Sequence, residues 1–152
     1  MPASIAITGS DTLIIQGINI TDFATGDVGK ITFPNDLIKV IVGKNLNAIF
    51  ATDYSGQLAE VEVGLLRGSA NDRALNALLL VQNLAGARKV LLQGVYIKVI
   101  GHGNGRVTND TYALAFGVFT KIPEAVTNTT GTEEQAITKY HLKFSNAARL
   151  VI

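Results

Sequence analysis

The chain has 152 residues, of which 47% are hydrophobic and 16% charged, so it can build the core of one domain over residues 1–152, and wholesale disorder is excluded. Thirteen Lys and Arg against twelve Asp and Glu leave a formal charge of +1, which excludes the basic surface of a sequence-reading DNA-binding protein. The absence of cysteine excludes disulfides, thiolate metal sites and a cysteine nucleophile.

Nothing at the start of the chain reads as a basic segment followed by a sustained apolar run, and no run approaches the ~18–20 apolar residues of a membrane span. We therefore expect synthesis in the cytoplasm and no membrane partner. The low share of charged residues leaves little polar side chain to cover a free monomer. This indicates that part of the surface is buried against other copies.

Short apolar segments rich in Ile, Val, Phe and Tyr recur along the chain between Gly, Asn, Asp or Thr, which is typical of strands and turns. In chain order the predicted strands are Ile5–Thr8, Thr12–Ile20, Ile31–Phe33, Ile38–Val42, Ala48–Tyr54, Leu58–Leu66, Val90–Ile100, Tyr112–Phe119 and Ile137–Phe144, the last running on to Val151.

The clearest two-residue period lies within Leu58–Leu66, where apolar residues at odd positions alternate with Glu60, Glu62 and Gly64. We expect the apolar set to face the core and the two glutamates to face water. The apolar set consists of Ala59, Val61, Val63 and Leu65.

One segment departs from the strand pattern and predicts the only substantial helix, over about residues 70–84. Ser69 precedes the carboxylate of Asp72 by three residues, as in a capping box, and Gly86 is a suitable end. The apolar side of this helix should pack on a sheet, so the fold class is mainly β, a sandwich or barrel with one flanking helix. The leucines of that side are Leu75, Leu78 and Leu79.

The sequence carries few signals of catalysis or of metal and cofactor binding. Gly101–Gly105 is followed by neither a helix nor a Lys-Ser/Thr pair, so we interpret it as a hairpin loop and not as a phosphate-binding loop. His102 and His141 lie far apart and lack a second ligand at metal-binding spacing. We expect no cofactor, no metal and no enzymatic activity.

Two other classes of function stay open at this point. A β-fold hydrolase would use the carboxylate pair Glu60 and Glu62 for acid–base chemistry, although a solvated strand face explains the pair as well. A β-sandwich module for a small ligand or glycan would need a concave site lined by aromatic residues, and the chain has no Trp.

The order of the predicted elements carries a family resemblance. Asp53–Asp72 places a D-Y-S-G turn, the alternating strand and the run L-L-R-G-S-A-N-D directly before the predicted helix. A long strand follows, and Val118–Ala125 leads through a polar turn into the strand Ala136–Phe144. This arrangement resembles the tail tube proteins of bacteriophages, especially those of contractile-tailed phages. The polar loop Gly101–Asn109 departs from the pattern.

The resemblance implies a structural subunit of the virion tail, forming stacked hexameric rings around a hollow lumen through which DNA passes without specific binding. Its partners would be further copies of itself, together with sheath, baseplate and terminator proteins. Inner tubes of phage-derived contractile injection particles and of type VI secretion systems share the implied fold, and the sequence does not separate these alternatives.

Two sets of residues are expected to serve such a tube. Asn45–Leu66 contains no Lys or Arg but three acids, which suits a lumen wall that must not hold phosphates, and we expect Glu60 and Glu62 to face the lumen. A polar turn between two strands is expected to contact the next ring. The residues of that turn are Gly43, Lys44, Asn45 and Asn47.

Overall fold

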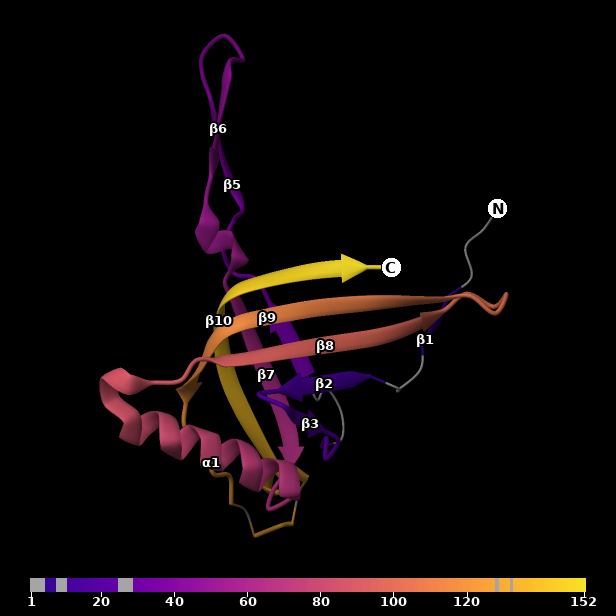
Figure 1. Cartoon of the computed structure of the whole chain (residues 1–152), viewed down its shortest axis with the longest axis vertical. Coiled ribbons are helices and arrows are strands. Elements are labelled where there is room, and N and C mark those ends of the chain that lie inside the picture. The colour runs from indigo at the N-terminus through magenta and orange to yellow at the C-terminus, as the bar shows by residue number, and fades with distance from the viewer. Residues whose placement is uncertain (1–4, 8–10, 25–28, 128, 132) are drawn as a thin grey trace.

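A curled antiparallel sheet dominates the computed structural model, which describes residues 5–7, 11–24, 29–127, 129–131 and 133–152 (Figure 1). The strand order is β3-β2-β8-β9-β10-β7-β4, and β1 pairs with the end of β8. The protein is therefore mainly β and barrel-like. The strands are β1 (Ala6–Ile7), β2 (Thr12–Ile15), β3 (Ile18–Ile20), β4 (Gly29–Thr32), β7 (Ala59–Leu66), β8 (Leu92–Gly101), β9 (Val107–Lys121) and β10 (Ile137–Val151).

The remaining two strands, β5 (Ile38–Val42) and β6 (Ala48–Thr52), form a separate hairpin that projects away from the body of the molecule (Figure 1). Short 3₁₀ turns follow three of the elements. These turns are η1 (Tyr54–Gln57), η2 (Gly86–Arg88) and η3 (Glu133–Ala136).

The predicted helix is confirmed as α1 (Ala70–Ala85), the only α-helix within the described residues. The Ser69 hydroxyl accepts a hydrogen bond from the backbone N–H of Asp72 at 3.2 Å, and the Asp72 carboxylate accepts one from the N–H of Gly68 at 2.8 Å. Both contacts satisfy donors near the start of the helix, as a capping box does. The helix ends at Gly86, whose positive φ of 58° suits glycine.

The core lies inside the curl of the sheet, between the inner faces of the strands and α1. The alternation predicted for β7 is confirmed, because Ala59, Val61, Val63 and Leu65 are buried while Glu60 and Glu62 are partly exposed. Helix α1 contributes Leu75 and Leu79, with Leu78 at the margin. The largest fully buried side chains are Tyr140, Phe144, Ile15, Ile20, Leu65, Leu75, Leu142 and Val63.

The prediction of a single strand over Thr12–Ile20 is wrong. Gln16 and Gly17 both have positive φ, at 50° and 78°, and form a two-residue turn that folds β3 back on β2. Glutamine is not a residue that typically marks such a turn, so the sequence reads as continuous. Of the other predicted strands, Ile38–Val42 and Ile137–Val151 occur with the predicted bounds and the rest occur with shifted bounds, and Thr8 lies outside the described residues.

A sharp bend in β9 and β10 divides the outer face of the sheet into two parts. Leu114 and Gly117 both face the core, although two intervening residues would normally place them on opposite sides. Phe116, between them, has a φ of 57°, and the pairing with β8 shifts register here. Phe144 and Ala147 on β10 show the same offset. A different alternating set of β9 and β10 residues therefore faces outward on each side of Phe116.

Candidate assembly surfaces

The β5–β6 hairpin is the most exposed apolar feature of the described structure. All ten of its strand residues are exposed, including Val40 at 55% and Phe50 at 69%. An isolated two-stranded hairpin is marginally stable at best in water, and monomeric proteins rarely leave such a surface uncovered. The large apolar residues of its strands are Ile38, Val40, Ile41, Val42, Ile49 and Phe50.

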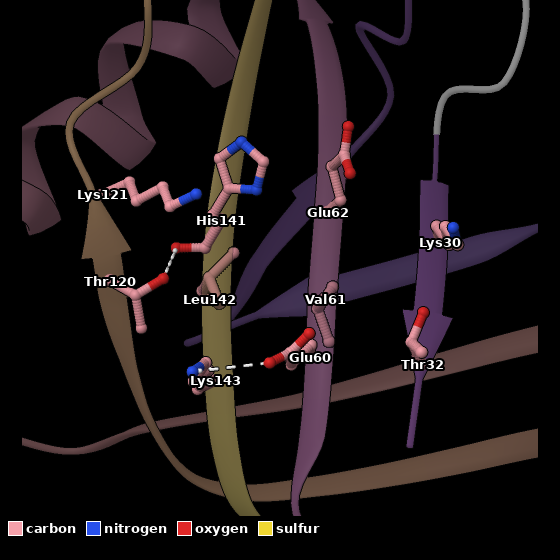
Figure 2. A pocket seen from close by; sticks show the side chains of 10 residues that line it. All are labelled: Lys30, Thr32, Glu60, Val61, Glu62, Thr120, Lys121, His141, Leu142 and Lys143. Atoms are coloured by element: carbon pink, nitrogen blue, oxygen red, sulfur yellow. Dashed lines mark hydrogen bonds and ion pairs between the residues drawn. The ribbon is translucent and has the colours of Figure 1, made fainter. Parts of the chain in front are cut away.

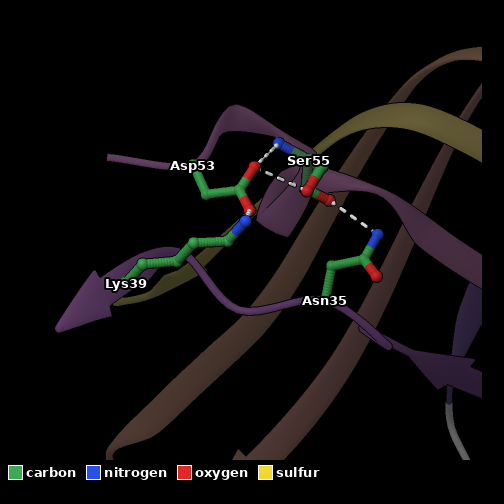
Figure 3. A network of polar contacts seen from close by, with 4 residues as sticks. All are labelled: Asn35, Lys39, Asp53 and Ser55. Atoms are coloured by element: carbon green, nitrogen blue, oxygen red, sulfur yellow. Dashed lines mark hydrogen bonds and ion pairs between the residues drawn. The ribbon is translucent and has the colours of Figure 1, made fainter. Parts of the chain in front are cut away.

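A polar network fixes the base of this hairpin (Figure 3). The Asp53 carboxylate accepts hydrogen bonds from the N–H and the hydroxyl of Ser55, at 3.1 and 2.7 Å, and Lys39 Nζ lies 3.7 Å from it. The bonds from Ser55 hold the pKa of Asp53 below its ordinary value. Asn35 donates to the carbonyl of Ser55 at 3.2 Å. The hairpin therefore leaves the body at a defined point.

Gly56 completes the base because no other residue fits there. A Cβ atom at this position would lie 2.6 Å from the carbonyl oxygen of Asp36 and from the Cα of Leu37, both of them backbone atoms. The segment Asp53–Gly56, singled out in the sequence, thus receives a structural explanation: it turns the chain from β6 into β7 under the hairpin.

The residues predicted to contact the next ring form the tip of the hairpin. The N–H of Gly43 donates to the carbonyl of Asn47 at 2.6 Å, and Lys44 and Asn45 lie in the turn between them. Leu46, at a positive φ of 65°, is 87% exposed at this tip. Sequence reasoning identified the polar turn but missed that the apolar strands behind it are equally exposed.

The two faces of the hairpin differ in charge. Register pairs place Ile38 opposite Thr52, Val40 opposite Phe50 and Val42 opposite Ala48 on one face, which carries no charge. The other face includes Lys39, which pairs with Asp53. We call the first set the apolar face of the hairpin; its members are Ile38, Val40, Val42, Ala48, Phe50 and Thr52.

Glu60 and Glu62 lie on the outer face of the sheet on the α1 side of the bend (Figure 2). Glu60 pairs with Lys143 at 3.4 Å and Glu62 with Lys139 at 3.7 Å. One cross-strand row joins Lys30, Glu62, His141 and Lys121. A shallow hollow of ≈ 470 Å³ opens over these side chains. We call this surface the charged face: Lys30, Glu60, Glu62, Lys121, Lys139, His141 and Lys143.

The surface around Glu60 and Glu62 is not acidic, although the sequence window that contains them holds acids and no Lys or Arg. Four lysines and two glutamates give the charged face a net charge of +2 when His141 is neutral. The sequence window Asn45–Leu66 holds only the acids, and the lysines arrive from β4, β9 and β10 through strand pairing. That Glu60 and Glu62 face a lumen stays a prediction.

The outer face beyond the bend carries no charged residue within the described strands. Cross-strand rows run from Val95 through Ala113 to Ala148 and from Ile97 through Thr111 to Leu150. Ala113, Ala148 and Leu150 are exposed, the last at 57%. We call this surface the uncharged face: Thr12, Ile14, Val95, Ile97, Val99, Val107, Asn109, Thr111, Ala113, Ala115, Asn146, Ala148 and Leu150.

The charged residues of these same strand segments point to the inner side and are paired there. Arg149 donates two hydrogen bonds to the Asp110 carboxylate at 2.9 and 3.0 Å, which hold the pKa of Asp110 below its ordinary value. Lys98 Nζ lies 2.9 Å from Asp11. Partial burial, followed by the neighbouring Asp11 carboxylate, raises the pKa of Tyr96 to about 12.

One edge of this part of the sheet lacks a strand partner, although η1 lies against β10 there. Strand β7 pairs with β10 only over Ile137–Phe144, whereas β9 continues along β10 as far as Val151. Among the described strands, β9 is thus the one partner of residues 146–151. An exposed strand edge is a template for pairing with another chain.

The described part of the chain offers little catalytic or metal-binding chemistry. No three His, Cys, Asp or Glu side chains gather there as a metal site would require. His102 Nε2 instead lies 2.7 Å from the Thr108 hydroxyl in the β8–β9 hairpin. The ion pairs of Glu60 and Glu62 with lysines favour a solvated face over an acid–base pair.

Helix α1 is too short and too polar to span a membrane, and no other helix in the described residues could do so. No family model matches the chain, and no curated protein matches its sequence.

Proposed function

We propose that this protein is the structural subunit of a bacteriophage tail tube, which assembles into stacked hexameric rings around a channel for DNA. The observation that carries the proposal is the β5–β6 hairpin, whose apolar side chains stand clear of the body on a fixed base. Burying an exposed Val, Ile or Phe side chain is worth roughly 1.5–3 kcal/mol, so covering the hairpin would favour association strongly.

Unpaired strand edges support the same proposal. The edge of β10 along residues 146–151 and the outer edge of β4 lack a further strand among the described residues, whereas Asn71 of α1 already donates to the carbonyl of Asn19 on the edge of β3. Pairing between copies would satisfy these backbone groups and close the curled sheet into a larger barrel. The hairpin and these edges are different surfaces, as head-to-tail association into rings or filaments requires.

The inner tube of a contractile injection particle or of a type VI secretion system is the second candidate. The assembly argument above applies to it unchanged, because only the cargo of the channel differs. Particles purified from producing cells would separate the two. Tubes attached to a DNA-filled capsid support the phage tail, and tubes without capsids support an injection particle.

A ligand-binding module receives less support from the surface. The hollow on the charged face is lined mostly by lysines, glutamates and threonines, together with Val61, His141 and Leu142, and no Phe or Tyr lines it. The most exposed aromatic residues lie elsewhere, with Phe50 on the hairpin, Tyr54 at its base and Phe116 at the bend.

Electron microscopy of the purified full chain tests the proposal. Hollow tubes or six-fold rings are expected for the wild type. A variant in which residues 38–52 are replaced by a short Asn-Gly turn should remain a folded monomer, because the body keeps its core. An E124A variant, at an exposed position outside the hairpin and the strands, is the control and should still assemble. A wild-type chain that stays monomeric at high concentration would contradict the proposal.

A further inference from the structure

The apolar face of the hairpin needs a surface on which to pack, and we call that docking surface the seat. We infer that the apolar face of the β5–β6 hairpin of one copy packs on the uncharged face of another copy. This inference rests on the self-assembly proposed above and adds the identity of the surface that receives the hairpin. Both surfaces lack charge, the hairpin face is fully exposed and the uncharged face is exposed or half-buried, and within one copy neither covers the other.

The two surfaces are alike in architecture as well as in polarity. Each is the flat side of antiparallel strands, and two such sides pack face to face at about 10 Å. Five residues of a hairpin strand extend about 17 Å, which fits along the part of β9 from Val107 to Ala115.

A shallow strip of small side chains crosses the seat. Ala113 and Ala148 are direct cross-strand neighbours, whereas the adjacent row contains Ile97 and Leu150. The missing side-chain volume at the two alanines leaves room for a large residue from the partner. Phe50 is the bulkiest side chain on the apolar face of the hairpin and the natural occupant.

The charged face is a poor alternative seat. Its four lysines and two glutamates would lose water against the apolar face of the hairpin, which has no groups to pair with them. Removing charges from water without partners costs free energy that apolar contact does not return.

The outer side of α1 is the remaining apolar alternative. Leu80, Val81 and Leu84 are exposed there, between Arg73 and Arg88. A helix presents a narrow, convex stripe, so a flat two-stranded hairpin would contact few of its side chains at once. The uncharged face offers a broader and flatter contact.

The hairpin of the same copy does not occupy this seat. Its strand residues are all exposed, and Asp53, Ser55 and Lys39 hold its base so that it points away from the body (Figure 1, Figure 3). The seat must therefore be filled by a hairpin from a second copy. Such a contact joins two different surfaces and propagates from one subunit to the next.

Chemical cross-linking tests the contact directly, because the chain has no cysteine of its own. Chains carrying only F50C and chains carrying only A113C are mixed during assembly and treated with a short bismaleimide. A covalent heterodimer is the expected product. Matched controls pair F50C with E62C on the charged face and with L84C on the outer side of α1, and both should yield at most a small fraction of that product.

The outcomes separate this inference from the proposed function. Rings or tubes in which F50C joins E62C or L84C, or none of the three, would overturn the seat and leave the tail tube proposal standing. Absence of any rings or tubes for the wild type would overturn both.

A complementation experiment gives an independent readout. The A113K/A148K variant keeps its hairpin but has a charged seat, and the hairpin-shortened variant keeps only the seat. Each should be a folded monomer alone, with cooperative melting by circular dichroism, and an equimolar mixture should form a one-to-one dimer. Failure of the mixture to associate would count against the seat, as would polymerisation of A113K/A148K alone.

Discussion

The two parts of the outer sheet face are built from the same strands but differ in chemistry. On the α1 side of Phe116, β9 and β10 contribute Lys121, Lys139 and Lys143 to the charged face. Beyond it, the same two strands present Ala113, Ala148 and other uncharged residues. The bend, and not the identity of the strands, therefore determines which residues are exposed on the outer face, because it divides each strand into two segments.

The strands that form the uncharged face do contain charged residues. Lys98, Asp110 and Arg149 belong to its strands and all point to the inner side, where Asp11 completes the pairs. Exposed Lys and Glu side chains have little free-energy cost on a water-facing strand. A strand segment that turns every charged side chain to the inner side therefore requires an explanation. Burial of this face in the proposed assembly would explain it, whereas the charged face suits continued contact with water.

Truncating the aromatic side chain that packs at the bend should have the largest effect on the free energy of unfolding. Phe144 is fully buried, and its ring packs so tightly under Gly117 that no Cβ atom fits there. F144A should lower the free energy of unfolding by about 3–5 kcal/mol, through lost apolar contact and a cavity. Denaturant unfolding of the purified variant measures this change.

The matched control for that prediction is F116A, which truncates the neighbouring aromatic residue at the same bend. Phe116 is 51% exposed, so its truncation should change stability by less than about 1 kcal/mol. Equal losses for the two variants would show that the ring of Phe144 does not anchor the bend.

Much of the local structure was predictable, and its sources can be named. The alternation around Val61 and Val63 fixed the sides of β7, and the Ser69–Asp72 spacing located the start of α1 within one residue. These signals act over a few neighbouring residues. The prediction of a mainly β fold with one helix is confirmed for the same reason.

The surfaces were less predictable because they depend on strand pairing across the chain. Lys30 reaches the row of Glu62 through β4, and Lys121 reaches it through β9 and His141, at sequence separations that no local pattern spans. The strands of the hairpin were correctly placed, but nothing local distinguishes exposed Val40 from a buried strand residue. Burial is a tertiary property.

Two lysines allow the inner and outer sides of the sheet to be compared directly, because each forms an ion pair with a carboxylate but the two pairs differ in exposure. Lys98 pairs with Asp11 on the partly buried inner side, with both side chains less than a third exposed, whereas Lys143 pairs with Glu60 at nearly half exposure. K98A should cost about 1–3 kcal/mol because it leaves Asp11 with a lost partner in a partly desolvated site. Thermal or denaturant unfolding checks this value.

K143A is the control, and an exposed pair of this kind is worth about 0–1 kcal/mol. A double variant D11A/K98A should recover part of the loss seen for K98A, because the partly desolvated carboxylate is removed, while the Tyr96 hydroxyl that donates to Asp11 at 3.2 Å loses its acceptor. If K98A and K143A destabilised the protein equally, the inner and outer pairs would not differ in the way described.

The pH dependence of stability offers a smaller contrast. The hydrogen bonds from Arg149 lower the pKa of Asp110 below its ordinary value of 3.8. The unfolded chain then binds a proton more readily than the folded one, so this stabilisation is present above about pH 4 and is lost as pH falls through the folded pKa. D110N should flatten the decline of melting temperature between about pH 5 and 2.

The corresponding change on the charged face serves as the comparison for D110N. E60Q removes a carboxylate that, like its partner Lys143, is nearly half exposed. This ion pair lacks the two hydrogen bonds that Arg149 donates to Asp110. Its melting temperature should follow the wild-type curve more closely across the same pH range. A D110N curve that overlays the wild type would show that the Asp110–Arg149 pair contributes no acid-dependent stability.

Reversing the acids of the charged face should affect stability only modestly, although this change tests the channel most directly. In E60K/E62K the net charge of the face rises from +2 to +6, since two negative charges become two positive ones. Both positions are partly exposed and their ion pairs are weak, so the subunit should fold and lose no more than about 1–2 kcal/mol. If the charged face lines the lumen, every ring repeats the added lysines around the DNA, and release of the DNA should slow and become steeply dependent on salt, because each phosphate contact releases counterions. E60Q/E62Q, which adds no lysine, should slow release less. Unchanged ejection kinetics in E60K/E62K particles at low salt would place the charged face away from the channel, and that result would contradict the lumen assignment of Glu60 and Glu62 while leaving the seat of the hairpin untouched.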